Sequence, residues 1–338
     1  MNQNWQQFLQ SQNAHIENGS VRDFGDAGAE RLAARDASIL CDLSESGLLR
    51  VSGEEAQTFL QSLLSNDIRE VDGQRAQFSS LNDPKGRMVA SFLIWRDAAD
   101  YLLQLPRVLC EPVRKRLAMY VLRAKVKIAD ASDDFVLLGL AGVAATTVVQ
   151  SLGDNLGMRS ENGRSLIRLA ANRYQLCLSP DAAPALWPQL ATTIKPAGNA
   201  CWNWLVICAG MPVIEPATQL QFVPQMINFE VIGGINFKKG CYPGQEIVAR
   251  MHYLGKPKRR MFLAHVASDA APHAGDSLFS ADMGDQPAGM VVNAAASPDG
   301  GCDLLAVVHI ASHDSQTIHL SAQDGPTLVF RPLPYALP

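Results

Sequence analysis

The chain has 338 residues, of which 47% are hydrophobic and 18% are charged. Such a length exceeds one compact core and predicts two or three domains, and the composition excludes a disordered chain. The 29 Lys and Arg against 33 Asp and Glu leave a net charge of −4, which excludes a polyanion binder whose whole surface is basic.

The chain begins with a polar segment, residues 1–20, in which a short helix is expected around Trp5 to Leu9. This segment lacks the basic and apolar regions of a secretory signal. The longest apolar run, Met88 to Trp95, falls far short of the roughly 20 residues that a membrane span needs. We therefore expect a cytoplasmic protein that does not contact a membrane.

Between residues 37 and 95 the pattern predicts strands around one helix. Ala37 to Val51 is strand-like with a polar break, which predicts a hairpin. Glu54 to Leu64 starts with acidic residues and carries its apolar residues on one face, as an amphipathic helix does. Two strands, Phe78–Leu81 and Met88–Trp95, then flank the polar turn Asn82–Arg87, which is either a plain hairpin turn or a second functional loop.

The next stretch, from about residue 106 to 190, predicts a small α+β domain with an antiparallel sheet. No motif of known chemistry falls within it. Helices are expected at Pro106–Ala118, Gly142–Leu152 and Ala182–Leu190, and strands at Tyr120–Ile128, Phe135–Leu140, Ser165–Leu169 and Tyr174–Leu178.

After Lys256 short strands alternate with Gly, Pro and Asp turns, which predicts an all-β domain such as a barrel. Six of the seven histidines also fall after residue 250. Two of them, His309 and His313, would lie about 13 Å apart along a strand, too far to share one ion, so no metal site is expected. The strands are Arg260–Val266, Ala288–Val292, Leu304–Ile310, Thr317–Leu320 and Thr327–Phe330.

The most distinctive stretch runs from Phe237 to Arg250 and places Cys241 between Gly240 and the pair Pro243-Gly244. Such a sequence predicts a sharp turn that presents the thiol. Neighbouring cations favour the thiolate, which is the reactive form. The seven cysteines include no Cys-x-x-Cys pair, so reduced thiols are expected. The alternative is that Cys241 is a small buried hydrophobe in an ordinary turn.

Two further patterns each leave two readings open. The first is a basic window from Lys238 to Arg260. Clustered cations of this kind bind anions such as a polyglutamate tail, a phosphate or RNA, but they also form the solvated edge of a domain. Trp202 and Trp204 lie in a run that predicts a strand or the start of a helix, and at strand period they would face the same side. They either pack in a core or line a pocket for a flat heterocycle. The cations of the basic window, against the single acid Glu246, are Lys238, Lys239, Arg250, Lys256, Lys258, Arg259 and Arg260.

The stretch Lys238-Lys239-Gly240-Cys241-Tyr242-Pro243-Gly244-Gln245-Glu246 closely resembles the signature of the YgfZ family of folate-binding proteins. The resemblance covers nearly the whole chain after about residue 38. It extends to the segments Asp83–Arg87, Ala209–Ile214, Gln221–Gln225, Gly233–Ile235 and Pro332–Tyr335.

This resemblance implies an α+β fold similar to the T-protein of the glycine-cleavage system, a ring of three domains around a tetrahydrofolate channel. Residues 1–37 would be an N-terminal extension, and 38–110 with 200–255 a discontinuous folate-binding domain. Residues 111–199 would form a ferredoxin-like α+β domain, and 256–338 a β-barrel.

The resemblance also implies a folate-binding accessory protein, with tetrahydrofolate or a derivative as cofactor and iron-sulfur enzymes or their assembly proteins as partners. Through those enzymes it would support methylthiolation of tRNA. Cys241 would be the reactive residue. Folate would contact Trp202, Gln225, Lys239, Tyr242 and Arg250. The residues that shape the motif would be Gly240, Gly244, Gln245, Glu246, Asp83, Lys85 and Gly86.

Two departures from the family pattern bear on function. Ser46 stands where a second folate-contacting tryptophan is expected, and Ala90 and Ser91 stand where the T-protein has a catalytic aspartate. Without a carboxylate to move a proton, aminomethyl transfer should be slow or absent. This departure counts against one alternative function, a tetrahydrofolate-dependent aminomethyl transferase. A second alternative is direct tRNA binding by residues 256–260.

Overall fold

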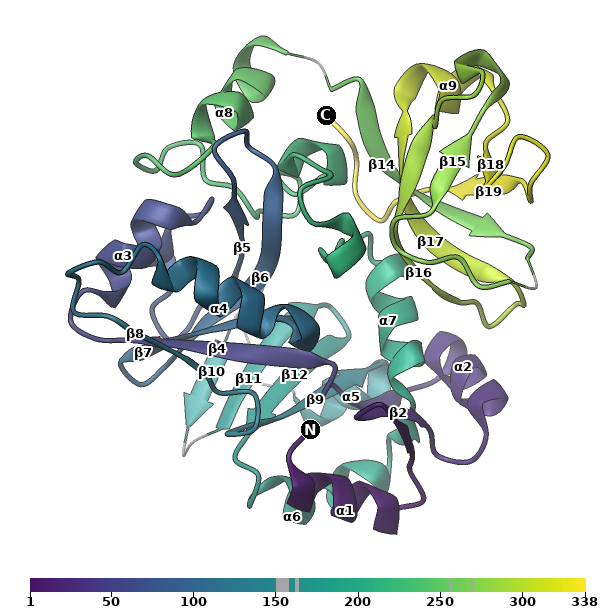
Figure 1. Ribbon diagram of the computed structural model, residues 1–338. Coiled ribbons are helices and arrows are strands. Elements are labelled where there is room, and N and C mark those ends of the chain that lie inside the picture. Colours follow the sequence, from purple (N-terminus) through teal and green to yellow (C-terminus); the bar gives the residue numbers. More distant parts are fainter. Residues whose placement is uncertain (150–157, 162–163, 256, 269) are drawn as a thin grey trace. The chain divides into compact units, whose positions relative to one another are not determined.

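The computed structural model describes residues 1–149, 158–161, 164–255, 257–268 and 270–338 (Figure 1). The chain forms two compact units. The first contains residues 1–61, 68–77 and 92–202, and the second contains 62–67, 78–91 and 203–338. No helix in the described ranges is long and apolar enough to cross a membrane.

The first unit contains a six-stranded sheet in the order β10-β11-β12-β9-β3-β13. Its neighbours pair antiparallel except β13 with β3, which run parallel. These strands are β3 Ile39–Asp42, β9 Val136–Ala141, β10 Met158–Glu161, β11 Arg164–Ala170, β12 Arg173–Leu178 and β13 Lys195–Ala197. The accompanying elements are α1 Gln3–Ser11, α2 Ala27–Asp36, α5 Val143–Val148, α6 Ala183–Ala191 and the hairpin of β1 His15–Glu17 and β2 Ser20–Asp23.

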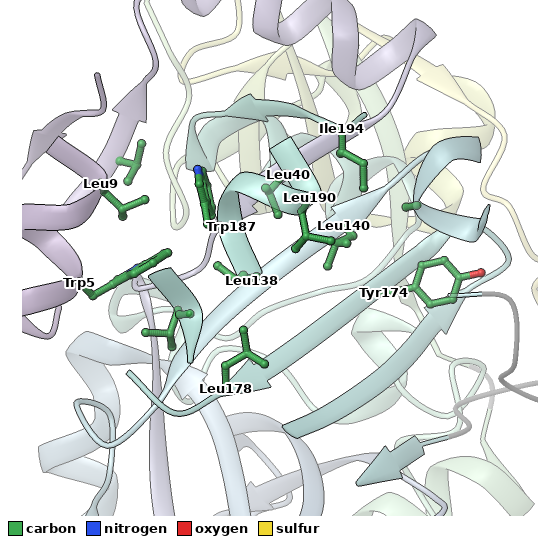
Figure 2. Close-up of a cluster of buried hydrophobic side chains, with 14 of the residues drawn as sticks. Trp5, Leu9, Leu40, Leu138, Leu140, Tyr174, Leu178, Trp187, Leu190 and Ile194 are labelled. Carbon is green, nitrogen blue, oxygen red and sulfur yellow. The ribbon is translucent and has the colours of Figure 1, made fainter. Parts of the chain in front are cut away.

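The N-terminal helix α1 belongs to the core of this unit (Figure 2). The Asn2 side chain caps the helix by accepting from the amides of Asn4 and Trp5. Trp5 and Leu9 are buried with Trp187 of α6 and leucines of β9. The indole of Trp5 also donates a 2.7 Å hydrogen bond to the buried carboxylate of Asp42, so the N-terminal segment is a structural part of the first unit.

A second sheet has the order β5-β6-β7-β4-β8, and its strands β5 and β6 each contribute residues to both units. The polar turn predicted between residues 82 and 87 does join β5 to β6. The strands are β4 Ser46–Ser52, β5 Gln77–Asn82, β6 Met88–Asp97, β7 Asp100–Pro106 and β8 Lys127–Asp130, with helices α3 Ala56–Leu63 and α4 Cys110–Ala118.

The second unit contains the predicted C-terminal β structure, in the order β18-β15-β16-β17-β14-β19. A bridge between His319 and Thr327 links the two ends of this order and closes the sheet into a barrel. Helix α8, Gln245–Leu254, precedes the first of these strands, and α9, Ile310–Ser315, follows β17. The strands are β14 Arg259–Val266, β15 Ser277–Phe279, β16 Gly289–Ala296, β17 Cys302–His309, β18 His319–Leu320 and β19 Leu328–Arg331. Helix α7, Asn199–Cys208, spans the boundary between the units.

Two local predictions were wrong, and a third had left two alternatives open. The hairpin predicted within 37–51 does not form, because β3 pairs with β9 and β13 whereas β4 pairs with β7 and β8. The strand predicted at Tyr120–Ile128 begins only at Lys127, after consecutive turns. Of the strand and the helix expected for Trp202 and Trp204, the structure shows the helix, so the two side chains point in different directions and do not share a face.

The described residues test one further prediction in part and leave another untested. The helix expected at Gly142–Leu152 is observed as α5, which ends at Val148, and most of the loop that follows it lies outside the described residues. The division into an extension and three domains stays a prediction.

Candidate functional site

The cysteine motif forms a tight turn that leads into α8. Gly244 caps the helix with a left-handed φ of +77°, and its carbonyl accepts from the amide of Val248 at 3.2 Å. Gln245 and Glu246 then form the first helical turn. Glycine adopts this φ without the steric cost that other residues incur, so the motif needs glycine at position 244. Gly240 has no such need, because its φ lies outside the left-handed range and no atom approaches it.

The turn packs directly against the Asn82–Arg87 loop of the same unit. A methyl group on Gly244 would lie 2.4 Å from the carbonyl oxygen of Asp83 and 2.5 Å from the Cα of Gly86. Gly86 is itself left-handed, at φ +75°, and lies against Ile247 of α8. The two motifs, about 160 residues apart in sequence, are therefore one structural feature.

Asp83 organises this loop from within. Its carboxylate accepts from the backbone amides of Lys85 and Arg87 at 2.9 and 2.8 Å, and its backbone pairs with Arg87 and Gly86. Such a turn is the usual role of aspartate at this position. Arg87 extends the contact by donating to the carbonyl of Leu220, while Lys85 is exposed.

Two side chains of the cysteine motif, Lys239 and Tyr242, point inward and anchor it. The ammonium of Lys239 is buried, where it donates to the carbonyls of Leu64 and Asn66 and lies 5.1 Å from the centre of the Tyr242 ring. Tyr242 is also buried, and this burial raises the pKa of its hydroxyl. Lys238 remains at the surface, so only one of the two predicted lysine cations is exposed beside the thiol.

Cys241 stands apart from the other six cysteines because its side chain is exposed. Cys208 is half-buried, and the remaining five are buried. Burial raises the pKa of the Cys110 thiol to about 11 and that of Cys201 to about 12, which keeps them neutral and unreactive. Burial likewise raises the pKa of the thiols of Cys41, Cys177 and Cys302.

Gln225 and Arg250, also predicted to contact folate, lie in the second unit with the motif. The Gln225 side chain is buried and donates a 2.7 Å hydrogen bond to the carbonyl of Val248, which holds the 3₁₀ turn Pro224–Ile227 against α8. Its carbonyl oxygen, Oε1, has no hydrogen-bond partner within the described ranges. Arg250 is exposed on α8.

The predicted basic window is not a continuous surface. Arg260 is buried, donating at 2.6 Å to Glu230 and at 3.1 Å to Asn228. Burial raises the pKa of Glu230, whereas the Arg260 guanidinium acts to lower it. Sequence reasoning missed this pair because the partners are 30 residues apart and share no motif. Lys256 lies outside the described residues.

Trp202 lies in the first unit, on the face of β9. It is 6% exposed, and its ring covers Gly139, where a methyl group would come within 2.6 Å of the ring carbons. Trp204 belongs to the second unit and donates to the buried carboxylate of Asp303 at 2.8 Å. Both tryptophans therefore have packing roles in their own units.

The position of the expected catalytic aspartate holds no acid. Ala90 is fully buried, and the hydroxyl of Ser91 accepts from the amide of Ile214 at 3.0 Å. Ser46, at the position of the second tryptophan, is half-buried at the start of β4. Across the described residues, no three His, Cys, Asp or Glu side chains are grouped so as to hold a metal ion.

Comparisons with known proteins agree with this architecture. Residues 6–164 match the family model described as the GCVT N-terminal domain. The chain is 31% identical over 314 residues to the tRNA-modifying protein YgfZ of Escherichia coli O127:H6, covering 90% of this chain and 95% of that protein. It is also 31% identical over 316 residues to the protein of the same name from Colwellia psychrerythraea, covering 90% and 96%.

A solved structure shares the fold. The glycine cleavage system aminomethyltransferase T from Bartonella henselae superposes with a TM-score of 0.76 at 16% identity, covering 98% of this chain and 96% of that one. The predicted fold class, an α+β fold of the glycine-cleavage T-protein type, is thereby confirmed.

Proposed function

We propose that this chain, which belongs to the YgfZ family of tRNA-modifying proteins, takes part in tRNA modification as a folate-binding accessory protein of iron-sulfur enzymes, with Cys241 as its reactive residue. The observation that carries the proposal is the contrast between Cys241 and its neighbours. Lys239 and Tyr242 are anchored inward while the thiol between them is exposed. A rigid turn that presents a single thiol suits covalent chemistry with an incoming partner.

Folate binding is supported by polar groups that lack partners. Both amide atoms of Gln77 in the first unit and Oε1 of Gln225 in the second are buried without a hydrogen-bond partner among the described residues. A buried amide is stable only when its hydrogen bonds are satisfied, and a pterin ring offers both donors and acceptors. Gln225 would hydrogen-bond the folate, with Arg250 of the same unit available for its carboxylates. The contact that the resemblance to the family assigns to Trp202 is tested by substitution. When bound, the folate would supply one-carbon chemistry.

The role of Cys241 can be tested in cells. In a strain that lacks its own copy of the gene, the wild-type protein should restore the methylthiolation of tRNA, whereas Cys241→Ser should not. Cys208→Ser provides the matched control, because that thiol is half-buried and outside the motif. Full restoration by Cys241→Ser would show that the thiol is not the reactive group.

Folate binding can be tested separately by calorimetric titration with tetrahydrofolate. Replacing Trp202 by leucine retains an apolar side chain but removes aromatic stacking, which should weaken binding by about two- to tenfold. Tyr253→Leu removes an exposed aromatic side chain of α8 and should leave the affinity unchanged. Undetectable binding by the wild-type protein would contradict the folate proposal and leave the role of Cys241 intact.

The aminomethyltransferase alternative is disfavoured by the residues at positions 90 and 91. A buried alanine cannot transfer a proton, and the neighbouring serine hydroxyl is occupied by a backbone amide. Turnover of a methylamine donor with tetrahydrofolate would revive that alternative.

A further inference from the structure

A segment of the first unit, residues 107–127, is far more basic than the protein as a whole. It contains helix α4 and the turns that lead to β8 (Figure 1). Seven cations stand against one acid, Glu111, in a chain whose net charge is −4. The cations are Arg107, Arg114, Lys115, Arg116, Arg123, Lys125 and Lys127.

Four of these cations are paired with acids. Arg107 pairs with Asp133, Arg114 and Lys115 share Glu111, and Lys125 pairs with Glu54 at 2.7 Å. The other three are Arg116, Arg123 and Lys127, and no carboxylate of the described chain forms an ion pair with them. Three positive charges thus lack an ion-pair partner within the stretch from Arg116 on α4 to Lys127 at the start of β8.

Apolar side chains project between these cations. Leu122 is 89% exposed, Met119 67% and Tyr120 39%. Leu122 also adopts a left-handed φ of +45°, an uncommon and strained conformation for a leucine. Such exposure of three large apolar side chains in one short turn is typical of a contact surface.

Contacts with residues 53–55 hold the turn in this conformation. The backbone amide of Lys125 donates at 2.6 Å to Glu55, and its side chain pairs with Glu54. The carbonyl of Lys125 closely approaches Gly53, where a methyl group would lie 2.0 Å away. A surface ordered before binding loses less conformational entropy when a partner docks.

We infer that this basic turn, residues 114–127, binds a single-stranded segment of RNA such as a tRNA loop. Arg116, Arg123 and Lys127 would contact phosphates, and a base would stack on Tyr120. Cations that flank an aromatic side chain are the combination that recognises unpaired nucleotides. The surface is a better candidate than residues 256–260, because Arg260 is buried in its ion pair with Glu230. This inference does not depend on the chemistry of Cys241.

The test is fluorescence anisotropy with labelled total tRNA at several salt concentrations. Three phosphate contacts on a single strand predict that log affinity falls with log salt with a slope of about −2. Replacing Arg116, Arg123 and Lys127 by alanine should abolish most of this slope, and Tyr120→Ala should weaken binding by about tenfold. Cys241→Ser should bind as the wild type does, which separates this result from the test of the thiol.

A matched control removes three cations from elsewhere on the first unit. Arg22, Arg75 and Lys195 are exposed, and replacing all three by alanine changes the net charge equally. Circular dichroism should show that every variant is folded. The inference would be overturned if tRNA failed to bind at low salt or if both triple variants weakened binding equally. Variant-sensitive binding to phosphatidylglycerol vesicles without tRNA binding would also overturn it, since the surface would then face a membrane.

Discussion

Replacing Gly244 by alanine should destabilise the second unit more than any other single methyl group added to the cysteine motif. Two costs combine at this position. A left-handed backbone at φ +77° costs alanine about 1 kcal/mol relative to glycine. The added methyl group would also lie 2.4 Å from Asp83 O, 2.5 Å from Gly86 Cα and 2.6 Å from Gly86 N.

All three of those atoms belong to the backbone, so no side chain can rotate away. Relief requires that α8 and the Asn82–Arg87 loop separate, and overpacking of this kind typically costs about 1–3 kcal/mol. The expected loss in free energy of unfolding for Gly244→Ala is therefore about 2–4 kcal/mol, the sum of the conformational and packing costs.

Two other glycines of the same region separate these costs. Gly233 has the same φ of +77° but no atom near the added methyl group, so Gly233→Ala should lose only about 1 kcal/mol. Gly240 is neither left-handed nor crowded, so Gly240→Ala should change stability by less than about 0.5 kcal/mol.

Urea titration, followed by tryptophan fluorescence and by hydrogen exchange of the α8 amides, would measure the three variants against the wild type. The expected order of stability loss is Gly244, then Gly233, then Gly240. A Gly244→Ala protein as stable as Gly240→Ala would refute the packing of the motif turn against the Asn82–Arg87 loop.

Three further predictions follow from single contacts. A thiol reagent should label Cys241 fastest in the native protein and Cys208 next; a fast phase that persists in Cys241→Ser would contradict this. Trp5→Phe removes the hydrogen bond to the buried Asp42 carboxylate and should lower the free energy of unfolding by about 2–3 kcal/mol in urea. Burial raises the pKa of Glu230 above its usual value of 4.5. The free energy of unfolding of the wild type should therefore fall relative to that of Glu230→Gln as the pH rises from about 4.5 through the raised pKa. A difference in free energy between the two proteins that does not change with pH would contradict this.

Local sequence determined much of the site. The pair Pro243-Gly244 and the charged residues around it predicted a turn that exposes Cys241. The structure shows Cys241 exposed in such a turn. The polar turn at Asp83 was also readable, because aspartate, proline and glycine each favour that geometry on their own. The C-terminal strands and α3 followed from the spacing of their apolar residues, since that spacing depends only on which face is buried.

Tertiary structure decided what depends on partners distant in sequence. The strands β3 and β4 look like two arms of one hairpin, yet each finds its neighbour elsewhere because sheet pairing is a long-range choice. Arg260 and Lys239 resemble their exposed neighbours in sequence, but Glu230 and the carbonyls of Leu64 and Asn66 hold them inside. Charge can be read from a sequence, whereas burial is set by which groups the fold brings near, and only the structure shows those groups.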